Sequence, residues 1–386
     1  MYNRIIESIA LKHMEKRRCL TLVGPRQSGK TTLCKKLFPQ YEYYSFESPD
    51  IRDQFYFDSR GFLLNIQNNA IFDEVQKVPE LLSYLQEILD DPDDARKFIL
   101  TGSNNLRLSN KISQTLAGRT KILQLLPLQR DEITRDDQKQ DIDSTLLFGS
   151  YPRIYNEKLD PSDWLGDYLQ TYVEKDIRDT VNITDLRSFN NFLRLLAGRV
   201  GQIMSFNSLA GDTGITQPTV KKWVSALETT FICFILQPHF RNFNKRITKA
   251  PKVFFYDTGL LCYLLRIKNT EQLRVHPLRG AIFENWIISE FLKRYSNRGE
   301  EAPLYFWRDQ HGHEIDLVID QGLFLDFFEI KSSMTFQKDF MKNIKWINKL
   351  QGSKKGNCIY GGEKKVSLGD TELIPWNSLF GSTDKE

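Results

Sequence analysis

The chain has 386 residues, of which 40% are hydrophobic and 26% charged, and its formal net charge is +4. Because typical domains have about 100–200 residues, this length predicts two to four units. No run of about 18 apolar residues is present, which predicts no membrane span, and the N-terminal residues lack a signal-peptide pattern, which predicts a cytoplasmic protein. The five cysteines are scattered without a C-x-x-C pair, so disulfides and structural zinc are not expected.

A glycine-rich segment matches G-x-x-x-x-G-K-[ST] at every fixed position. An apolar run suited to a buried strand precedes it at 19–23, and a helix is expected at 32–37; this is the context that the motif requires. Backbone N–H groups and the positive end of the helix then face one point, where a polyphosphate can bind. We expect Lys30 to reach the β- and γ-phosphates of ATP and the Thr31 hydroxyl to join the Mg²⁺ shell; a chance glycine loop is the alternative. The expected nucleotide-binding residues are Gly24, Pro25, Arg26, Gln27, Ser28, Gly29, Lys30, Thr31 and Thr32.

Two acidic residues follow a short apolar segment at 69–72. This is the form of the second nucleotide-site motif, in which Asp73 holds Mg²⁺ directly or through water. Glu74 is then placed to polarise the attacking water, so it is our candidate general base. Two acids after a strand often mark only the start of a helix, but the phosphate loop about 40 residues upstream favours the nucleotide-site interpretation.

A third buried strand is expected at 97–102, followed by polar residues. The carboxyl ends of parallel strands line the ligand crevice, so Ser103 or Asn104 could orient the catalytic water or sense the γ-phosphate. A turn with a helix cap is the alternative. Arg119 precedes another expected strand at 120–125. It could neutralise transition-state charge at a neighbour's nucleotide, which would require an oligomer, or it could be a surface arginine at a turn.

Residues 1 to about 130 resemble the AAA-type P-loop ATPases of bacteria and archaea, through the segments GPRQSGKTT, IFDEVQKVPELL and ILTGSNN. More narrowly, the chain resembles the subfamily whose C-terminal region is catalogued as a domain of unknown function. The segments FYDTGL at 255–260 and FEIKSS at 328–333, with Gly280 four residues before Glu284, extend this resemblance over nearly the whole chain. The resemblance implies ATP binding and hydrolysis.

The middle of the chain has the apolar spacing of helices. Residues 145–200 are expected to form the nucleotide lid, where Arg178, Arg194 and Arg199 are candidates to sense nucleotide. Residues 201–250 predict helix, tight turn, helix and strand, the outline of a winged helix-turn-helix. Basic residues on the second helix and just beyond it could contact DNA phosphates, or the unit could pack against a neighbouring domain. These basic residues are Lys221, Lys222, Arg241, Lys245, Arg246, Lys249 and Lys252.

Near the C-terminus, polar and apolar residues alternate at 313–320, and a second strand is expected at 323–331. With residues 321–322 as a two-residue turn, Asp316 lies opposite Phe327. Side chains two residues apart share a face, and a slip by one residue would separate them. One face of the hairpin is therefore expected to carry Glu314, Asp316, Glu329 and Lys331.

The spacing Asp-x12-Glu-x-Lys in this hairpin resembles the PD-(D/E)XK nuclease fold. The resemblance implies that the carboxylates of Asp316 and Glu329 bind Mg²⁺ and that Lys331 stabilises the nucleophile or the phosphate charge. Glu284, early in an apolar-striped helix, is the third expected metal ligand. A solvated strand face is the alternative, and a domain of this shape can also lack cutting activity.

Together these features predict an α/β protein in four parts. These are a P-loop NTPase with a parallel sheet (1–133), a helical lid (145–200), a winged helix (201–250) and an α/β nuclease-like domain (251–386). We expect a cytoplasmic AAA-type ATPase that uses ATP and Mg²⁺ and is coupled to a metal-dependent nuclease-like domain acting on DNA. The alternative is an ATP-dependent switch or scaffold whose C-terminal domain binds DNA or a protein partner without cleaving. A regulator acting through the winged helix alone is the least favoured alternative.

Overall fold

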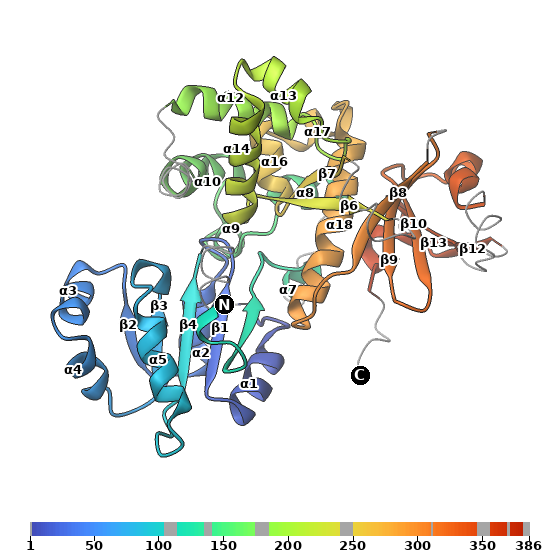
Figure 1. Ribbon diagram of the computed structural model, residues 1–386. Coiled ribbons are helices and arrows are strands. Elements are labelled where there is room, and N and C mark those ends of the chain that lie inside the picture. Colours follow the sequence, from blue (N-terminus) through green and yellow to red (C-terminus); the bar gives the residue numbers. More distant parts are fainter. Residues whose placement is uncertain are drawn as a thin grey trace.

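The computed structural model (Figure 1) describes residues 2–103, 114–134, 141–173, 185–239, 250–309, 312–345, 356–368 and 371–380. Two β-sheets organise it, one of five strands in the N-terminal part and one of eight strands in the C-terminal part. The helices between residues 185 and 229 lie above the first sheet in the view of Figure 1. Within the described residues, no helix is long and apolar enough to cross a membrane.

The first sheet is parallel throughout, with strand order β2-β3-β4-β1-β5. Its central strands are buried along their whole length, as their apolar runs predict for strands covered on both faces. The carboxyl ends of these strands meet at one edge, where the phosphate loop leads into α2. The expected parallel P-loop sheet is confirmed. Its elements are α1 (Glu7–Lys16), β1 (Cys19–Val23), α2 (Lys30–Leu37), β2 (Glu42–Ser45), α3 (Pro49–Phe57), α4 (Ser59–Leu64), β3 (Ala70–Asp73), η1 (Val75–Lys77), α5 (Leu81–Asp90), β4 (Phe98–Gly102) and β5 (Thr120–Gln124).

The middle of the chain is helical, and side-chain caps mark where several helices begin. Aspartates cap α8, α10 and α12, and Thr216 caps α14, with Pro218 in its first turn. Helix α13 packs against α12 and α14, and an antiparallel strand pair, β6 and β7, follows. The elements are α7 (Arg130–Thr134), α8 (Ile142–Phe148), α9 (Pro152–Asn156), α10 (Pro161–Tyr168), η2 (Leu169–Val173), α12 (Leu186–Ala197), α13 (Phe206–Thr213), α14 (Gln217–Thr229), β6 (Cys233–Pro238) and β7 (Lys252–Phe255).

The second sheet has the order β12-β13-β11-β10-β9-β8-β6-β7 and mixes parallel with antiparallel pairs. Strands β6 and β7 pair with each other across the predicted boundary at residue 250, and β6 also pairs with β8. The winged-helix and C-terminal regions of the prediction therefore share one sheet. Its remaining elements are α16 (Thr258–Leu264), α17 (Thr270–Val275), α18 (Arg279–Asn297), β8 (Leu304–Arg308), β9 (Glu314–Asp320), β10 (Leu325–Lys331), η3 (Lys338–Met341), β11 (Gly356–Tyr360), β12 (Val366–Leu368), β13 (Thr371–Pro375) and η4 (Trp376–Ser378).

The β9–β10 hairpin forms as expected, but its predicted register is wrong. Leu325 pairs with Asp320 and Phe327 with Val318, so four residues rather than two make the connection. This moves each partner by two positions, and Asp316 lies opposite Glu329 rather than Phe327. Because side chains alternate with a period of two, a shift by two leaves every side chain on its predicted face.

Helix α18 stands between the two sheets (Figure 1), and it contacts β5 of the first as well as β7 and β10 of the second. One continuous apolar core runs from the first sheet through the middle helices to α18 and the second sheet. The 19 residues of this helix span about 28 Å at 1.5 Å per residue. A single rigid element therefore reaches from the edge of the first sheet to the predicted C-terminal site.

Candidate functional site

The phosphate loop has the backbone shape that its glycines permit. Gly29 has φ of +94°, and a Cβ on Gly24 would lie 2.1 Å from the carbonyl oxygen of Leu125. The ammonium of Lys30 is buried under the loop and donates to the carbonyl oxygens of Gly24 and Pro25, each at 2.9 Å. The Ser28 hydroxyl is buried without a hydrogen-bond partner. An unpaired buried hydroxyl costs free energy, so a polar ligand at this loop would satisfy it.

Asp73 lies at the carboxyl end of β3 and is linked directly to the loop. Its Oδ2 accepts hydrogen bonds from the Thr31 hydroxyl at 2.9 Å and from the Tyr43 hydroxyl at 2.7 Å. The Thr101 hydroxyl donates to its other oxygen. Burial and the neighbouring Asp73 carboxylate raise the pKa of Tyr43 above its usual range, so Tyr43 remains a donor. The structure thus joins the two side chains predicted to hold Mg²⁺, Thr31 and Asp73.

Glu74 is buried beside Asp73, with a left-handed backbone (φ 59°). Its Oε2 accepts from the Ser103 hydroxyl at 3.1 Å and from the Gln76 side-chain amide, and its N–H donates to Thr101. These bonds hold the carboxylate at the edge of the sheet where β3 and β4 end. Of the two candidates after β4, Ser103 therefore contacts the predicted general base, whereas Asn104 lies outside the described residues.

A cavity of about 490 Å³ opens in front of the loop and is closed on the other side by α9. A smaller one of about 70 Å³ adjoins it, shares Gly29 and Pro152, and reaches Tyr2 and Leu128. The larger cavity has the polar lining that suits the phosphates of a nucleotide. The larger cavity is lined by Arg26, Gln27, Gly29, Lys30, Thr31, Thr32, Glu74, Pro152, Arg153, Asn156 and Glu157.

The arginines predicted to sense nucleotide from the lid do not line the cavity where the structure describes them. Arg178 lies outside the described residues, and Arg199 pairs with Asp212 between α12 and α13. Neither Arg194 nor Arg199 lines the cavity, whereas Arg153 of α9 does. A proline at the first helical position marks the start of α9 in the sequence, but a helix of five residues has too little periodicity to indicate which side it presents.

Arg119 lies at the opposite edge of the sheet from the phosphate loop. Thr120 pairs with Cys19 at the amino end of β1, so five residues, about 16 Å, separate Arg119 from the carboxyl ends of the strands. Its guanidinium donates two hydrogen bonds to the Asp90 carboxylate, at 2.6 and 2.7 Å. Arg119 therefore cannot serve the nucleotide of its own chain, and any catalytic role would have to be in a neighbouring subunit.

The C-terminal residues predicted as one site do come together, with an additional cation among them. The ammonium of Lys252 lies 3.1 Å from Glu284 and 2.5 Å from Glu314. That of Lys331 lies 2.7 Å from Glu329 and 3.5 Å from Asp316. We call these four acids, Glu284, Glu314, Asp316 and Glu329, the carboxylate cluster.

Lys252 corrects a prediction, because it is buried in the carboxylate cluster instead of facing DNA from the winged helix. Burial alone lowers the pKa of a lysine, but the carboxylates of Glu284 and Glu314 raise that of Lys252 above its usual value, so it stays an ammonium. Of the other basic candidates, Lys221 and Lys222 are exposed on α14. The remaining ones, Arg241, Lys245, Arg246 and Lys249, lie outside the described residues.

Two members of the carboxylate cluster, Glu284 and Glu329, are more basic than free carboxylates. Burial and the nearby Asp316 carboxylate raise the pKa of Glu284 to about 8 and that of Glu329 to about 7. The Oε2 atom of Glu329 is buried without a hydrogen-bond partner. Across the described part of the chain, however, no three His, Cys, Asp or Glu side chains gather in a way that could hold a metal ion. The two ammonium groups lie between the acids, so the predicted metal shell of Glu284, Asp316 and Glu329 is not formed in this arrangement.

Three segments of the chain match known families. Residues 16–134 match the AAA domain, residues 139–271 match a domain of unknown function (DUF8612), and residues 279–379 match a second domain of unknown function (DUF4143). The first match covers the parallel sheet and the phosphate loop. This part of the chain is therefore similar to the AAA domain. The other two descriptions name no activity, so the nuclease-like character of the C-terminal region remains a prediction.

Proteins of similar sequence align with most of this chain. The uncharacterized protein Rv2008c of Mycobacterium tuberculosis (strain H37Rv) is 28% identical over 370 residues, covering 94% of this chain and 82% of that protein. The uncharacterized protein MJ1544 of Methanocaldococcus jannaschii is 21% identical over 330 residues, covering 77% and 71%. Among solved structures, the Walker-type ATPase PABY2304 of Pyrococcus abyssi aligns with a TM-score of 0.46 and 16% identity, covering 68% of this chain and 96% of that chain.

Proposed function

We propose that the chain binds ATP at the phosphate loop and hydrolyses it. The observation that carries this proposal is that Lys30, Thr31 and Glu74 line one cavity, while Asp73 accepts a hydrogen bond from the Thr31 hydroxyl. Each of these residue types has a place in phosphoryl transfer to water. The unpartnered Ser28 hydroxyl and the polar lining fit a polyphosphate.

Each side chain would act differently once ATP is bound. Lys30 would exchange the carbonyl oxygens of Gly24 and Pro25 for phosphate oxygens, which are stronger acceptors because they are charged. Thr31 and Asp73 would hold Mg²⁺, which neutralises phosphate charge when it is bound. Glu74 would accept a proton from the attacking water, while Ser103 keeps its carboxylate in place.

Phosphate release from ATP tests this proposal. Glu74→Gln removes the general base and keeps the size of the side chain, so we expect ATP binding to persist while turnover falls about 10²–10⁴-fold. Glu80→Gln, an exposed change six residues away, is the matched control. Normal turnover by Glu74→Gln would show that another group activates the water.

The proposal extends to the organisation of the chain. We assign the helical lid to 145–200, and we treat the winged-helix segment, 201–250, and the C-terminal segment, 251–386, as one unit because they share the second sheet. We further propose that Arg119 acts in trans within a homo-oligomer. Its place at the edge of the sheet remote from the chain's own phosphate loop supports this, and its contact with Asp90 would then open at the subunit interface.

A second candidate function concerns the carboxylate cluster, which we propose acts on DNA in an ATP-dependent way. What supports it is the meeting of Glu284, Asp316, Glu329 and Lys331, with one buried Glu329 oxygen unpartnered. A divalent cation among these acids would require Lys252 or Lys331 to move, because both ammonium groups now lie within ion-pair distance of them. The alternative is a switch or scaffold whose C-terminal domain binds DNA or a protein without cleaving.

An assay for cleavage of linear, circular and single-stranded DNA with Mg²⁺ or Mn²⁺, with and without ATP, distinguishes a cluster that cuts DNA from a switch or scaffold that does not. If the cluster cuts, Asp316→Ala and Lys331→Ala lose the cleavage shown by the wild type, and Glu363→Ala, an exposed change near the same strands, retains it. Absence of cleavage on every substrate, with ATPase activity intact, would favour the switch.

A further inference from the structure

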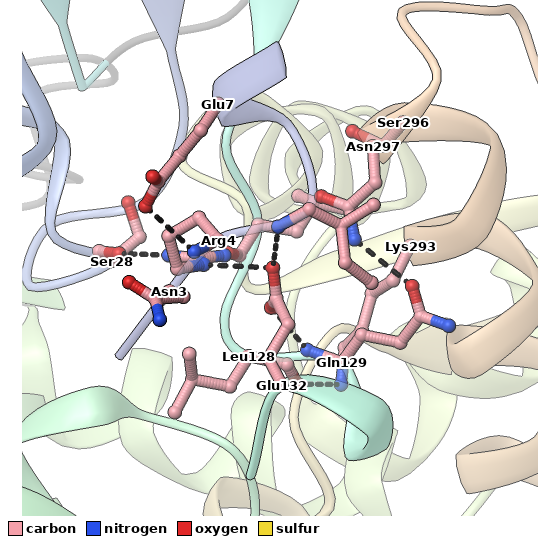
Figure 2. Close-up of polar contacts among 12 residues, drawn as sticks. Asn3, Arg4, Glu7, Ser28, Leu128, Gln129, Glu132, Lys293, Ser296 and Asn297 are labelled. Atoms are coloured by element: carbon pink, nitrogen blue, oxygen red, sulfur yellow. Dashed lines mark hydrogen bonds and ion pairs between the residues drawn. The ribbon is translucent and has the colours of Figure 1, made fainter. Parts of the chain in front are cut away.

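An arginine near the N-terminus, Arg4, lies directly behind the phosphate loop (Figure 2). Its guanidinium is buried and donates to the carbonyl oxygen of Ser28 at 2.9 Å and to that of Leu126 at 2.7 Å. Its Nε pairs with Glu132 at 3.1 Å. One side chain therefore joins the loop to the segment that follows β5, residues 126–132, which we call the connecting segment.

The contact with Ser28 fixes the direction of a peptide group that the phosphates need. In a trans peptide the carbonyl and the following N–H point in opposite directions. Because Arg4 donates to the Ser28 carbonyl, the N–H of Gly29 is directed away from Arg4, and Gly29 lines the larger cavity, whose lining does not include Arg4. A charged donor on the carbonyl also strengthens that N–H as a donor. Arg4 is thus placed as a positioning residue for phosphate binding.

The connecting segment is held firmly on the side of Arg4. Oε1 of Glu132 accepts from Arg4 and from the backbone N–H of Ile5 at 2.7 Å, and its Oε2 accepts from the N–H of Gln129 at 2.8 Å. Both partners of the ion pair are almost wholly buried. Desolvation offsets most of the attraction in a buried pair, whereas removal of one partner is strongly unfavourable. The pair therefore fixes geometry more than it adds stability.

Helix α18 holds the other side of the connecting segment (Figure 2). Lys293 donates to the carbonyl oxygen of Leu128 at 3.1 Å, and the amide of Asn297 donates to the Gln129 side chain at 3.0 Å. One turn away, Glu290 accepts from the backbone N–H of Arg130 at 2.9 Å. A displacement of the connecting segment must therefore either move α18 or break these buried bonds.

The N-terminal half of α18 contacts the carboxylate cluster. Glu284 of this helix binds Lys252 in the carboxylate cluster. Arg279, in its first turn, donates to Asp143 of α8 at 2.8 Å and to the carbonyl oxygen of Ser332 at 3.0 Å, directly after Lys331. Ser28, Arg4, the connecting segment and α18 thus form an unbroken series of contacts from the phosphate loop to the carboxylate cluster.

We propose that Arg4 and the connecting segment couple nucleotide binding at the phosphate loop to the position of α18, and through α18 to the carboxylate cluster. This inference rests on the proposed ATP binding, because the ligand is the event that is transmitted. The physical cause is local. Bound phosphates would accept from the Gly29 N–H and draw Lys30 away from the carbonyl oxygens of Gly24 and Pro25. Both changes alter the conformation of the loop to which Arg4 is hydrogen-bonded. A rigid helix then carries the change over about 20 Å, the 13 residues from Asn297 to Glu284.

Hydrogen exchange of the full chain, with and without a non-hydrolysable ATP analogue, tests the coupling. In the wild type we expect nucleotide to change the exchange of the phosphate loop, of the connecting segment and of α18. Arg4→Met should bind nucleotide about tenfold or more weakly, because the charged hydrogen bond from Arg4 to the Ser28 carbonyl is lost. At saturating nucleotide, the hydrogen exchange of α18 in this variant should no longer change. Arg17→Met, an exposed change at the end of α1, is the matched control.

A second variant separates coupling from a general loss of folding. Asn297→Ala leaves every contact of Arg4 intact, so its nucleotide affinity should equal that of the wild type while the response of α18 is reduced at least twofold. A full wild-type response of α18 in both Arg4→Met and Asn297→Ala would overturn the proposal. So would a wild type that binds nucleotide and protects its phosphate loop without any change in α18. Absence of nucleotide binding in a parallel titration of the wild type would instead refute the proposed ATP binding itself.

Discussion

Glu284→Gln should stabilise the protein at neutral and alkaline pH. The side chain of Glu284 is 16% exposed, and its carboxyl lies near Asp316 and Glu314. Burial and the Asp316 carboxylate raise its pKa from 4.5 to about 8, against the opposing effect of Lys252. Glutamine is a neutral side chain of the same shape whose oxygen can still accept from Lys252. The variant therefore keeps the contact and removes the proton that the folded state must retain.

The sign and size follow from proton linkage. Above pH 4.5 the unfolded chain releases this proton and the folded chain keeps it up to about pH 8, so the free energy of unfolding of the wild type falls as the pH rises between these values. At about 1.4 kcal/mol for each pH unit, the full effect at pH 7 is about 3 kcal/mol. Because the carboxyl keeps some solvent and shares its charge with several neighbours, we expect about 1–2 kcal/mol.

Urea unfolding at pH 5 and pH 8 measures this effect, with tryptophan fluorescence as the signal because Trp286 is buried two residues along α18. The variant and the wild type should be nearly equal at pH 5, and the variant should be more stable at pH 8. Glu301→Gln, an exposed change after α18, should show no such pH dependence. A variant that is equally destabilised at both values would refute the argument that Glu284 is held protonated.

Three further predictions concern the part of the chain that carries the phosphate loop. Mixing Arg119→Ala subunits with Lys30→Ala subunits should restore ATPase activity if an arginine acts in trans, and no recovery in a confirmed oligomer would assign Arg119 to the surface. Thr101→Val should lower the free energy of unfolding by about 1–3 kcal/mol, because it leaves the buried Glu74 N–H without its acceptor; a loss below about 0.5 kcal/mol would contradict this. Arg153→Ala should weaken ATP binding about tenfold in a titration, and an unchanged affinity would place Arg153 outside the site.

The arrangement of the candidate site at the phosphate loop was predictable because its motifs are local in sequence. The phosphate loop needs Gly24 and Gly29 for its backbone shape and Lys30 for its charge, and all three lie in one short segment of the chain. Asp73 ends β3 and Glu74 follows it directly, and the apolar run before them predicts the strand. Parallel pairing then brings the two motifs together without any further information, because carboxyl ends of parallel strands share one edge. The link between Thr31 and Asp73 in the structure follows directly from this rule.

Other features depend on tertiary contacts that the sequence pattern does not specify. The four-residue connection of the β9–β10 hairpin replaced the two-residue turn suggested by Gln321 and Gly322, and only the period of two kept the acids on one face. Lys252 looked like one of several surface cations, and its burial depends on Glu284 and Glu314 from other elements. Arg4 stands in no motif at all, because its partners come from segments more than 20 residues away.

Equilibrium binding of ATP with Mg²⁺ to the wild type and to Lys30→Ala tests the central claim most directly. Lys16→Ala, an exposed change at the end of α1, controls for the loss of one positive charge. The wild type and Lys16→Ala should bind alike, and Lys30→Ala should bind about 10–100-fold more weakly because charge-assisted bonds to the phosphates are lost. A folded Lys30→Ala that binds ATP as tightly as the wild type would contradict the assignment of the phosphate loop.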